Sequence, residues 1–191
     1  MRRLIATALA CFAMATLATA QTFEERTQLC LGCHGEKGQS ETAEVPSLGG
    51  LTSAYALIQL YMFREKLRTA EPMNDMMQGV SDGELQKLAD LIAKMPPPKA
   101  SAEPIDPERA ARAQGLIAAH RCAFCHNTGF PGTDSVPRLG GQREDYLVKT
   151  LTEYRSGKRN EYQPVMAEII RKLSDQDIAD LAHVIARTGA K

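Results

Sequence analysis

The 191-residue chain contains no tryptophan, and only 5% of its residues are aromatic. A small domain with so few large apolar side chains needs another source of buried surface, and a bound cofactor can supply it. An excess of charge of one sign is also missing, because 23 Lys and Arg balance 23 Asp and Glu. This balance gives no sign of a general nucleic-acid or membrane-surface binder, so we expect no nucleic-acid partner.

Long hydrophobic runs are scarce as well. The one apolar run, residues 4–17, is short for a membrane span, and no later segment is long enough. It follows two arginines and precedes the small-residue sequence Ala18-Thr19-Ala20, an order typical of a cleaved signal peptide. We therefore predict a signal peptide over residues 1–20 and a mature protein in the periplasm. A retained anchor and a lipoprotein attached through Cys11 are weaker alternatives.

The remaining cysteines are few and occur in two pairs, each followed directly by histidine. The two segments are Cys30-Leu31-Gly32-Cys33-His34 and Cys122-Ala123-Phe124-Cys125-His126. This spacing is typical of c-type haem attachment, in which both thiols bond to one haem and the histidine coordinates its iron. We predict two covalently bound haem c groups. A zinc site from four cysteines, or two redox disulfides, would not explain a histidine after each pair.

The two halves of the chain form an internal repeat. The first cysteines of the two motifs are 92 residues apart, and the segment 45–50 returns with an offset of 91 as 136–141. Three consecutive prolines lie between the halves and favour an extended linker. We expect an N-terminal domain over 21–95, a linker over 96–104 and a C-terminal domain over 105–191.

Both repeats carry helical signals, and no segment alternates as a strand would. Asp106 can cap a helix that has Pro107 at its first position and continues into the second haem motif. A further helix is expected over 142–156, ending at Gly157. Ser81 and Ser174 each begin a capping-box pattern before apolar residues at helical spacing. The predicted fold class is all-α, with one small helical domain around each haem.

The sixth iron ligand decides between electron transfer and substrate chemistry, since an axial methionine leaves the iron no open site. Met166 is the one methionine of residues 105–191, and an offset of 93 matches it to Met73. We predict these two as ligands, with Met76 as the alternative in the first repeat. The first repeat also contains Met62, Met77 and Met95. Bis-histidine coordination through His120 or His183 is a less favoured alternative.

The second repeat resembles the cytochrome c4 family of dihaem class I cytochromes. The resemblance rests on the segment 136–142, on Tyr146-Leu147 and on the segment 154–159, and it extends over the mature chain. It implies two tandem class I cytochrome c domains packed with their haem propionate edges near each other. It also implies that the carbonyls of Pro46 and Pro137 accept hydrogen bonds from the histidine ligands. The first repeat departs from this pattern, because Leu51 stands where the second has Gln142.

These observations predict an electron carrier rather than an enzyme. Its expected partners are a quinol-cytochrome c reductase and a terminal oxidase or another reductase, and peripheral docking on a membrane stays open. The alternative is an electron-acceptor subunit of a periplasmic dehydrogenase that oxidises sulfide or thiosulfate. An enzyme in its own right is disfavoured, since a thiosulfate-oxidising dihaem enzyme would use a free cysteine as axial ligand and the predicted mature chain has none left over.

The balanced total charge conceals an asymmetry between the halves. Residues 21–94 hold seven Lys and Arg against eleven Asp and Glu, a net charge of −4. Residues 105–191 hold thirteen against eleven, a net charge of +2. If the domains pack end to end, donor and acceptor could be steered to different domains.

Overall fold

The computed structural model describes residues 21–159 and 164–189, so the predicted signal peptide and Cys11 lie outside the described residues. Within these ranges the chain forms helices and no strand, apart from one isolated bridge between Thr133 and Val136. The helices are α1 (Phe23–His34), α2 (Ser53–Arg64), α3 (Met73–Met77), α4 (Asp82–Lys94), α5 (Pro107–Ala119), α6 (Cys122–His126), α7 (Glu144–Ser156), α8 (Pro164–Ile170) and α9 (Asp175–Ala186). The prediction of an all-α fold is confirmed.

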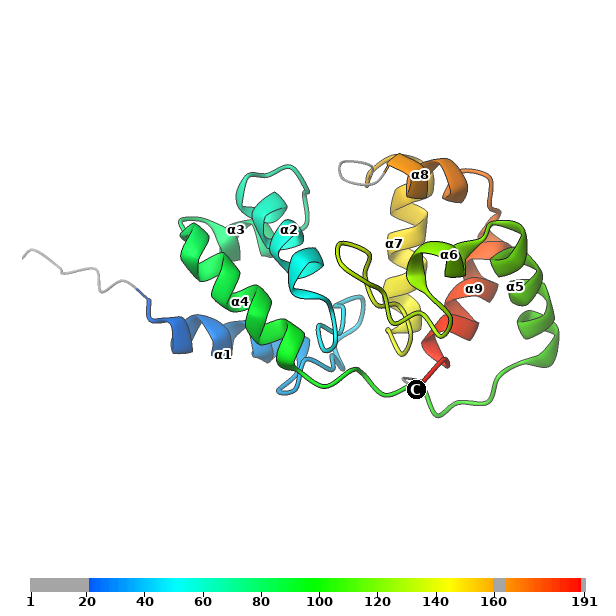
Figure 1. The fold of residues 1–191 in the computed structure, drawn as a ribbon, viewed down its shortest axis with the longest axis horizontal. Coiled ribbons are helices and arrows are strands. Elements are labelled where there is room, and N and C mark those ends of the chain that lie inside the picture. The colour runs from blue at the N-terminus through cyan, green and yellow to red at the C-terminus, as the bar shows by residue number, and fades with distance from the viewer. Residues whose placement is uncertain (1–20, 160–163, 190–191) are drawn as a thin grey trace, which may run out of the picture.

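The first domain contains α1 to α4, and its core lies between α2 and α4 (Figure 1). Phe63 of α2, Met77 of α3 and Leu85 of α4 are buried in this core. Helix α1 carries the first haem motif and lies at the edge of the domain. It contributes only Phe23 to the packed cluster, and His34 is its one buried residue.

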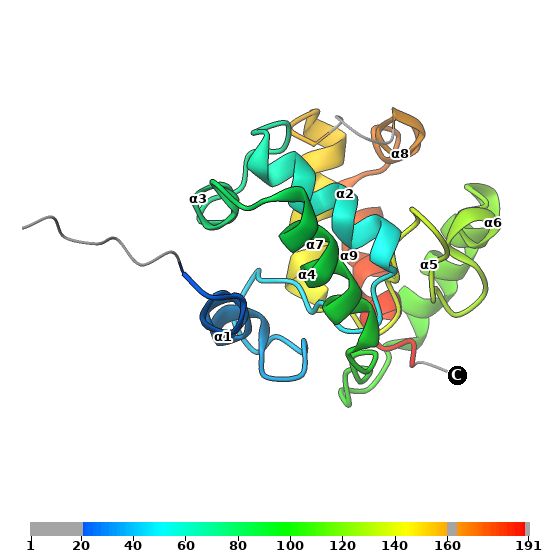
Figure 2. The same cartoon turned by 60° about the vertical axis from the view of Figure 1, so that its left-hand side comes forward.

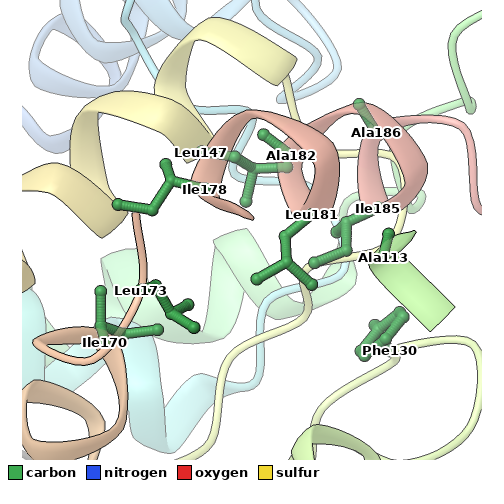
Figure 3. Packing of buried hydrophobic residues seen from close by; sticks show 10 residues of the cluster. All are labelled: Ala113, Phe130, Leu147, Ile170, Leu173, Ile178, Leu181, Ala182, Ile185 and Ala186. Atoms are coloured by element: carbon green, nitrogen blue, oxygen red, sulfur yellow. The ribbon is translucent and has the colours of Figure 1, made fainter. Parts of the chain in front are cut away.

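The second domain contains α5 to α9, and α9 is its central helix. Both α5 and α7 pack against α9. Figure 3 shows the apolar side chains gathered around it, with Leu181 and Ile185 of α9 near Ala113 of α5 and Phe130 of a loop. The helix that leads to the haem motif is therefore part of the core here, whereas its counterpart in the first domain is not.

The expected helix caps are confirmed, and the helix predicted over 142–156 begins two residues later, at Glu144, and ends before Gly157 as expected. The Asp106 side chain accepts hydrogen bonds from the backbone of Glu108 and Arg109, and Pro107 follows it at the start of α5. Ser81 and Ser174 each form a complete capping box. Such local hydrogen bonds satisfy backbone donors that the helix itself leaves unpaired.

One expectation about the second repeat was wrong. The helix from Pro107 does not continue into the haem motif, because it ends at Ala119 and Arg121 takes a left-handed conformation, with φ 54° and ψ 36°. A separate short helix, α6, then carries the motif. In the first domain the motif lies within the single helix α1.

The proline-rich segment crosses from one domain to the other along a glycine pair in each. A Cβ atom on Gly49 would lie 2.1 Å from the carbonyl oxygen of Pro96, and one on Gly141 would lie 2.6 Å from that of Pro98. The linker backbone thus packs where only glycine leaves room, which explains the Gly-Gly pair in both repeats. Figure 1 shows the two domains side by side above this connection, and in the turned view of Figure 2 α2 and α4 lie in front of α7 and α9. No helix in the described part of the chain is both long and apolar enough to cross a membrane.

Candidate functional site

Each motif histidine is buried and held by a proline carbonyl. The distance from Nδ1 of His34 to the carbonyl oxygen of Pro46 is 2.8 Å, and that from Nδ1 of His126 to Pro137 is 3.0 Å. A carbonyl can only accept, so Nδ1 carries the proton and Nε2 remains available to a metal. Burial lowers the pKa of both histidines, although the proline carbonyls oppose this effect. The neutral imidazole is the form that ligates metals.

The four described cysteines are free thiols located where each motif meets the surface. Cys33 and Cys125 are exposed, whereas Cys30 and Cys122 are half-buried, and burial raises the pKa of the latter two. Within the described ranges no three His, Cys, Asp or Glu side chains form a group that could hold a metal ion. The geometry therefore offers no four-cysteine zinc site.

Both motifs line one cavity of about 490 Å³ between the two domains. Its walls include the two histidines and all four cysteines, together with apolar side chains of α2, α4, α7 and α9. Among the predicted sixth ligands, Met73 and Met166 both lie in its wall. Met76 and Met95 line it as well, while Met62 and Met77 belong to the packed core. The cavity thus removes Met62 and Met77 from the candidate sixth ligands of the first domain and leaves Met73, Met76 and Met95.

The two other histidines have different environments. His183 is buried away from the cavity, and its Nε2 accepts a hydrogen bond from the backbone of Asp106 at 3.0 Å. His120 ends α5 and lies in the cavity wall beside Arg121. His183 therefore serves the packing of α5 on α9.

A cluster of two buried arginines and two half-buried tyrosines lines the cavity where it passes between the domains. Arg68 is 9% exposed and Arg159 is 4% exposed. The Arg159 guanidinium donates to the hydroxyl of Tyr55 across the interface at 3.0 Å. Both arginines lie 3.5 Å from the hydroxyl of Tyr146. Arg68 also donates to Gln59 Oε1 at 2.6 Å.

This cluster holds more positive charge than the described residues neutralise. The hydrogen-bond acceptors of Arg68 and Arg159 in the described ranges are neutral hydroxyl and amide groups. Burial alone would raise the pKa of Tyr146, but the two guanidinium groups outweigh it and lower that pKa to about 7. Buried charges need partners of opposite sign, so the cluster is suited to receive carboxylates.

The interface also contains a paired amide. Gln142 Oε1 accepts from the backbone N–H of Ser47, and Gln142 Nε2 donates to the Ser47 carbonyl, both at 2.8 Å. Both residues are buried. Leu51 stands at the position of Gln142 in the first repeat, so the first domain has no equivalent amide to make the reciprocal pair of hydrogen bonds.

The arginine–tyrosine cluster has no counterpart among the predictions made from the sequence. A signal was present, since Tyr55 and Arg68 return as Tyr146 and Arg159 with the same offset of 91. Their meeting in one cluster depended on the packing of the two domains, which the offset alone does not reveal.

The cavity fits two haem c groups by the chemistry of its walls. Each half offers two thiols for thioether bonds, a histidine with Nε2 available, and at least one thioether side chain. The apolar wall suits a porphyrin ring, and the unneutralised arginines suit its propionates.

Two segments of the chain, residues 19–96 and 110–188, each match the cytochrome c family. Cytochrome c4 of Pseudomonas aeruginosa is 31% identical over 173 residues, which is 85% of either chain. The thiosulfate dehydrogenase electron acceptor of Stutzerimonas stutzeri is also 31% identical, over 85% of this chain and 80% of that one.

Among solved structures, reduced cytochrome c4 from Pseudomonas stutzeri superposes with a TM-score of 0.76 and 26% identity. The match covers 88% of this chain and all of that one. The two haem motifs, the shared cavity and these similarities together show that the chain belongs to the cytochrome c4 family of dihaem electron carriers.

Proposed function

We propose that the mature chain carries electrons in the bacterial periplasm, from a quinol-oxidising complex to a terminal oxidase or a reductase. The observation that carries this proposal is the single cavity into which both motifs open. Two redox centres held against one interface can pass an electron between them without a second protein.

Each residue of the two sites has one task in this proposal. Cys30 and Cys33, and likewise Cys122 and Cys125, would hold a porphyrin covalently. His34 and His126 would bind its iron through Nε2, and the Pro46 and Pro137 carbonyls orient the rings and would make the imidazoles better donors. When bound, the haem iron supplies reversible one-electron chemistry.

The sixth ligands are assigned to Met73 and Met166 by their matched positions in the repeat. A methionine opposite histidine raises the potential and closes the iron to substrates. The test is replacement of each by alanine in the holoprotein. Each change should remove the thioether-to-iron absorption band of one haem only. If the band survives Met73→Ala and is lost in Met76→Ala, the first assignment is wrong, and Met95→Ala serves as a control that should keep both bands.

The carrier function is tested by a redox titration of the mature protein, alone and with membranes of its host. We expect two covalent haems per chain, two one-electron steps, and reoxidation by the membranes. A protein that holds one haem, or that turns over thiosulfate or peroxide by itself, would contradict the proposal. Export is tested separately. An exported and processed chain should begin at Gln21, and in a detergent phase separation it should partition into the aqueous phase.

A second candidate function is that of an electron-acceptor subunit of a periplasmic dehydrogenase. It is favoured by the similarity to the thiosulfate dehydrogenase electron acceptor of Stutzerimonas stutzeri. Both functions use the same haem sites and differ in the donor. Reduction of the purified protein by a thiosulfate-oxidising enzyme, at a rate above that with a quinol-oxidising complex, would favour the acceptor function.

A further inference from the structure

The helix that carries two candidate sixth ligands of the first site is short, and its own backbone does not close its end. Helix α3 has five residues, Met73–Met77. The last carbonyls of a helix have no partner within it. The Met76 carbonyl is one of these, and no backbone N–H in the described part of the chain donates to it. In the second domain the matching carbonyl, that of Ile169, accepts from the N–H of Lys172 at 3.2 Å.

A side chain of α1 supplies the missing donor. Nη1 of Arg26 donates to the Met76 carbonyl at 3.4 Å. The Arg26 side chain is only 13% exposed, and its Nε lies 3.8 Å from Oε1 of Glu84 on α4. Because a guanidinium group loses hydration when it is buried, this position is stable only through the contacts that Arg26 makes with α3 and α4.

Arg26 thereby connects the two helices that carry iron ligands in the first domain. Helix α1 carries His34, and α3 carries Met73 and Met76; all three residues line the cavity. Helix α1 contributes only Phe23 to the packed cluster, so apolar packing attaches it weakly. A contact between α1 and α3 therefore helps to fix the distance across which the first iron would be held.

Asn74 fixes α3 from another side. It is 3% exposed, and its amide nitrogen donates to the carbonyls of Phe63 and Arg68, both at 2.8 Å. Its Oδ1 accepts from the N–H of Ala70 at 2.7 Å. These bonds attach α3 to α2 and to the loop after it. The attachment of α3 to the motif helix α1 is left to Arg26.

The second domain holds its ligand helix differently. The positions that match Arg26 and Asn74 are Ala118 and Ala167, which have no polar side-chain group. Helix α8 there is longer, with seven residues, and backbone N–H groups satisfy its last carbonyls. The side-chain attachments through Arg26 and Asn74 therefore belong to the first domain.

We propose that Arg26 is a positioning residue that holds α3 against α1 and thereby keeps a methionine of α3 on the iron of the first site. The inference rests on the proposed carrier function, in which α3 supplies this sixth ligand, and it adds the residue that keeps the ligand in place. Without Arg26 the Met76 carbonyl would lose its donor, and α3 would open more often. An iron that has lost its sixth ligand is open to small molecules.

The test measures how fast imidazole displaces methionine from the oxidised holoprotein, followed by loss of the thioether-to-iron absorption band. A Met166→His background removes the band of the second haem, so the remaining band reports the first haem alone. At saturating imidazole the rate is set by dissociation of the methionine. Arg26→Leu should raise this rate about tenfold, because the helix that carries the ligand loses one of its attachments.

Three control variants separate this role from a general effect on stability. Arg26→Lys keeps a charged donor and should return the rate to within about threefold of wild type. Glu84→Gln removes the ion pair but can still form the capping box, and should change the rate less than about twofold. Glu24→Gln changes an exposed residue of the same helix and should have no effect.

An unchanged displacement rate in Arg26→Leu would overturn the proposal, as would an equal rise in Glu24→Gln. A loss of unfolding stability in Arg26→Leu without faster displacement would show that Arg26 has only a structural role, and the proposal would fail. Failure of the proposed carrier function looks different, because wild type would then lack two haems or reversible one-electron steps. If the first haem keeps its band in both Met73→Ala and Met76→Ala, α3 does not supply the ligand, and both the assignment and this proposal are wrong.

Discussion

The two domains share one repeat but differ in how each motif helix joins its core. In the second domain α5 packs against α9 through Ala113, Leu116 and Ile117. In the first domain α1 supplies only Phe23 to the packed cluster. The comparison shows that the same haem motif can be presented by a helix anchored in the core or by one at the edge.

The second domain strengthens its anchored helix with buried charge. Asp180 of α9 is 0% exposed and accepts from Arg112 Nε at 2.6 Å and from Arg109 Nε at 3.1 Å, both on α5. The matching position of the first domain is Lys87, which is exposed. The first domain has a looser ion pair between its corresponding helices, from Arg26 of α1 to Glu84 of α4 at 3.8 Å, and neither residue is buried. Within the described residues, a buried carboxylate therefore connects these two helices only in the second domain.

The largest expected effect on stability comes from breaking the ion pairs between Asp180 of α9 and the arginines of α5. Asp180→Asn should destabilise the second domain by about 3 kcal/mol, because it removes the buried carboxylate that Arg109 and Arg112 share and leaves them only their more exposed partners Glu144 and Glu108. Chemical denaturation followed by helix signal measures the loss. Lys87→Asn is the matched control and should change stability little. Equal losses of stability from both variants would show that the motif helix is attached to its domain in the same way in both halves.

Low pH should weaken the same ion pairs by protonating Asp180. The hydrogen bond from Arg112 lowers the pKa of Asp180, although burial opposes it. A carboxyl whose folded pKa lies below its unfolded value stabilises the protein above the unfolded pKa, about 4, and loses this contribution as pH falls through the folded value. Wild type should therefore lose stability below about pH 4 more steeply than Asp180→Asn. Parallel pH profiles would contradict this.

The next effect concerns the hydrogen bonds between Gln142 and Ser47 at the domain interface, which have no counterpart from the first domain. Gln142→Leu copies the residue of the first repeat and leaves both backbone groups of Ser47 unpaired. We expect a loss of about 2 kcal/mol, seen by calorimetry as a separation of the unfolding of the two domains. Gln78→Leu, at an exposed site, is the control. A single unchanged transition would mean that other contacts hold the domains together.

A smaller difference is expected in local stability. Backbone amides of α1 should exchange with solvent about tenfold faster than those of α5, because α1 has few buried neighbours. Hydrogen exchange followed by mass spectrometry of the holoprotein compares the two helices directly. Equal protection would show that the cofactor, and not core packing, anchors both motif helices.

The smallest effect should be the same in both domains. Ser81→Ala and Ser174→Ala each remove a capping box and should each cost about 1 kcal/mol. Denaturation midpoints of the two variants measure the losses. Values that differ strongly would indicate that the final helices of the repeats do not play equivalent roles.

Several features could be read from local sequence patterns alone. The caps of Asp106, Ser81 and Ser174 were predicted because a cap depends on residues within one turn of the helix. The all-α fold followed from helical spacing in both repeats. The break at Arg121 was missed, because neither glycine nor proline marks it and a left-handed arginine has no local signature.

By itself, the sequence determined the two haem motifs, their histidines and the candidate methionines, because covalent attachment and iron ligation require particular residue types at fixed spacing. Only the tertiary structure brought Arg68 and Arg159 together with Tyr55 and Tyr146 and joined Gln142 to Ser47. These contacts connect residues about 80 to 100 positions apart, and their existence depends on how two packed domains meet. Burial of charge at an interface is decided by the shape of both surfaces, which no local pattern specifies.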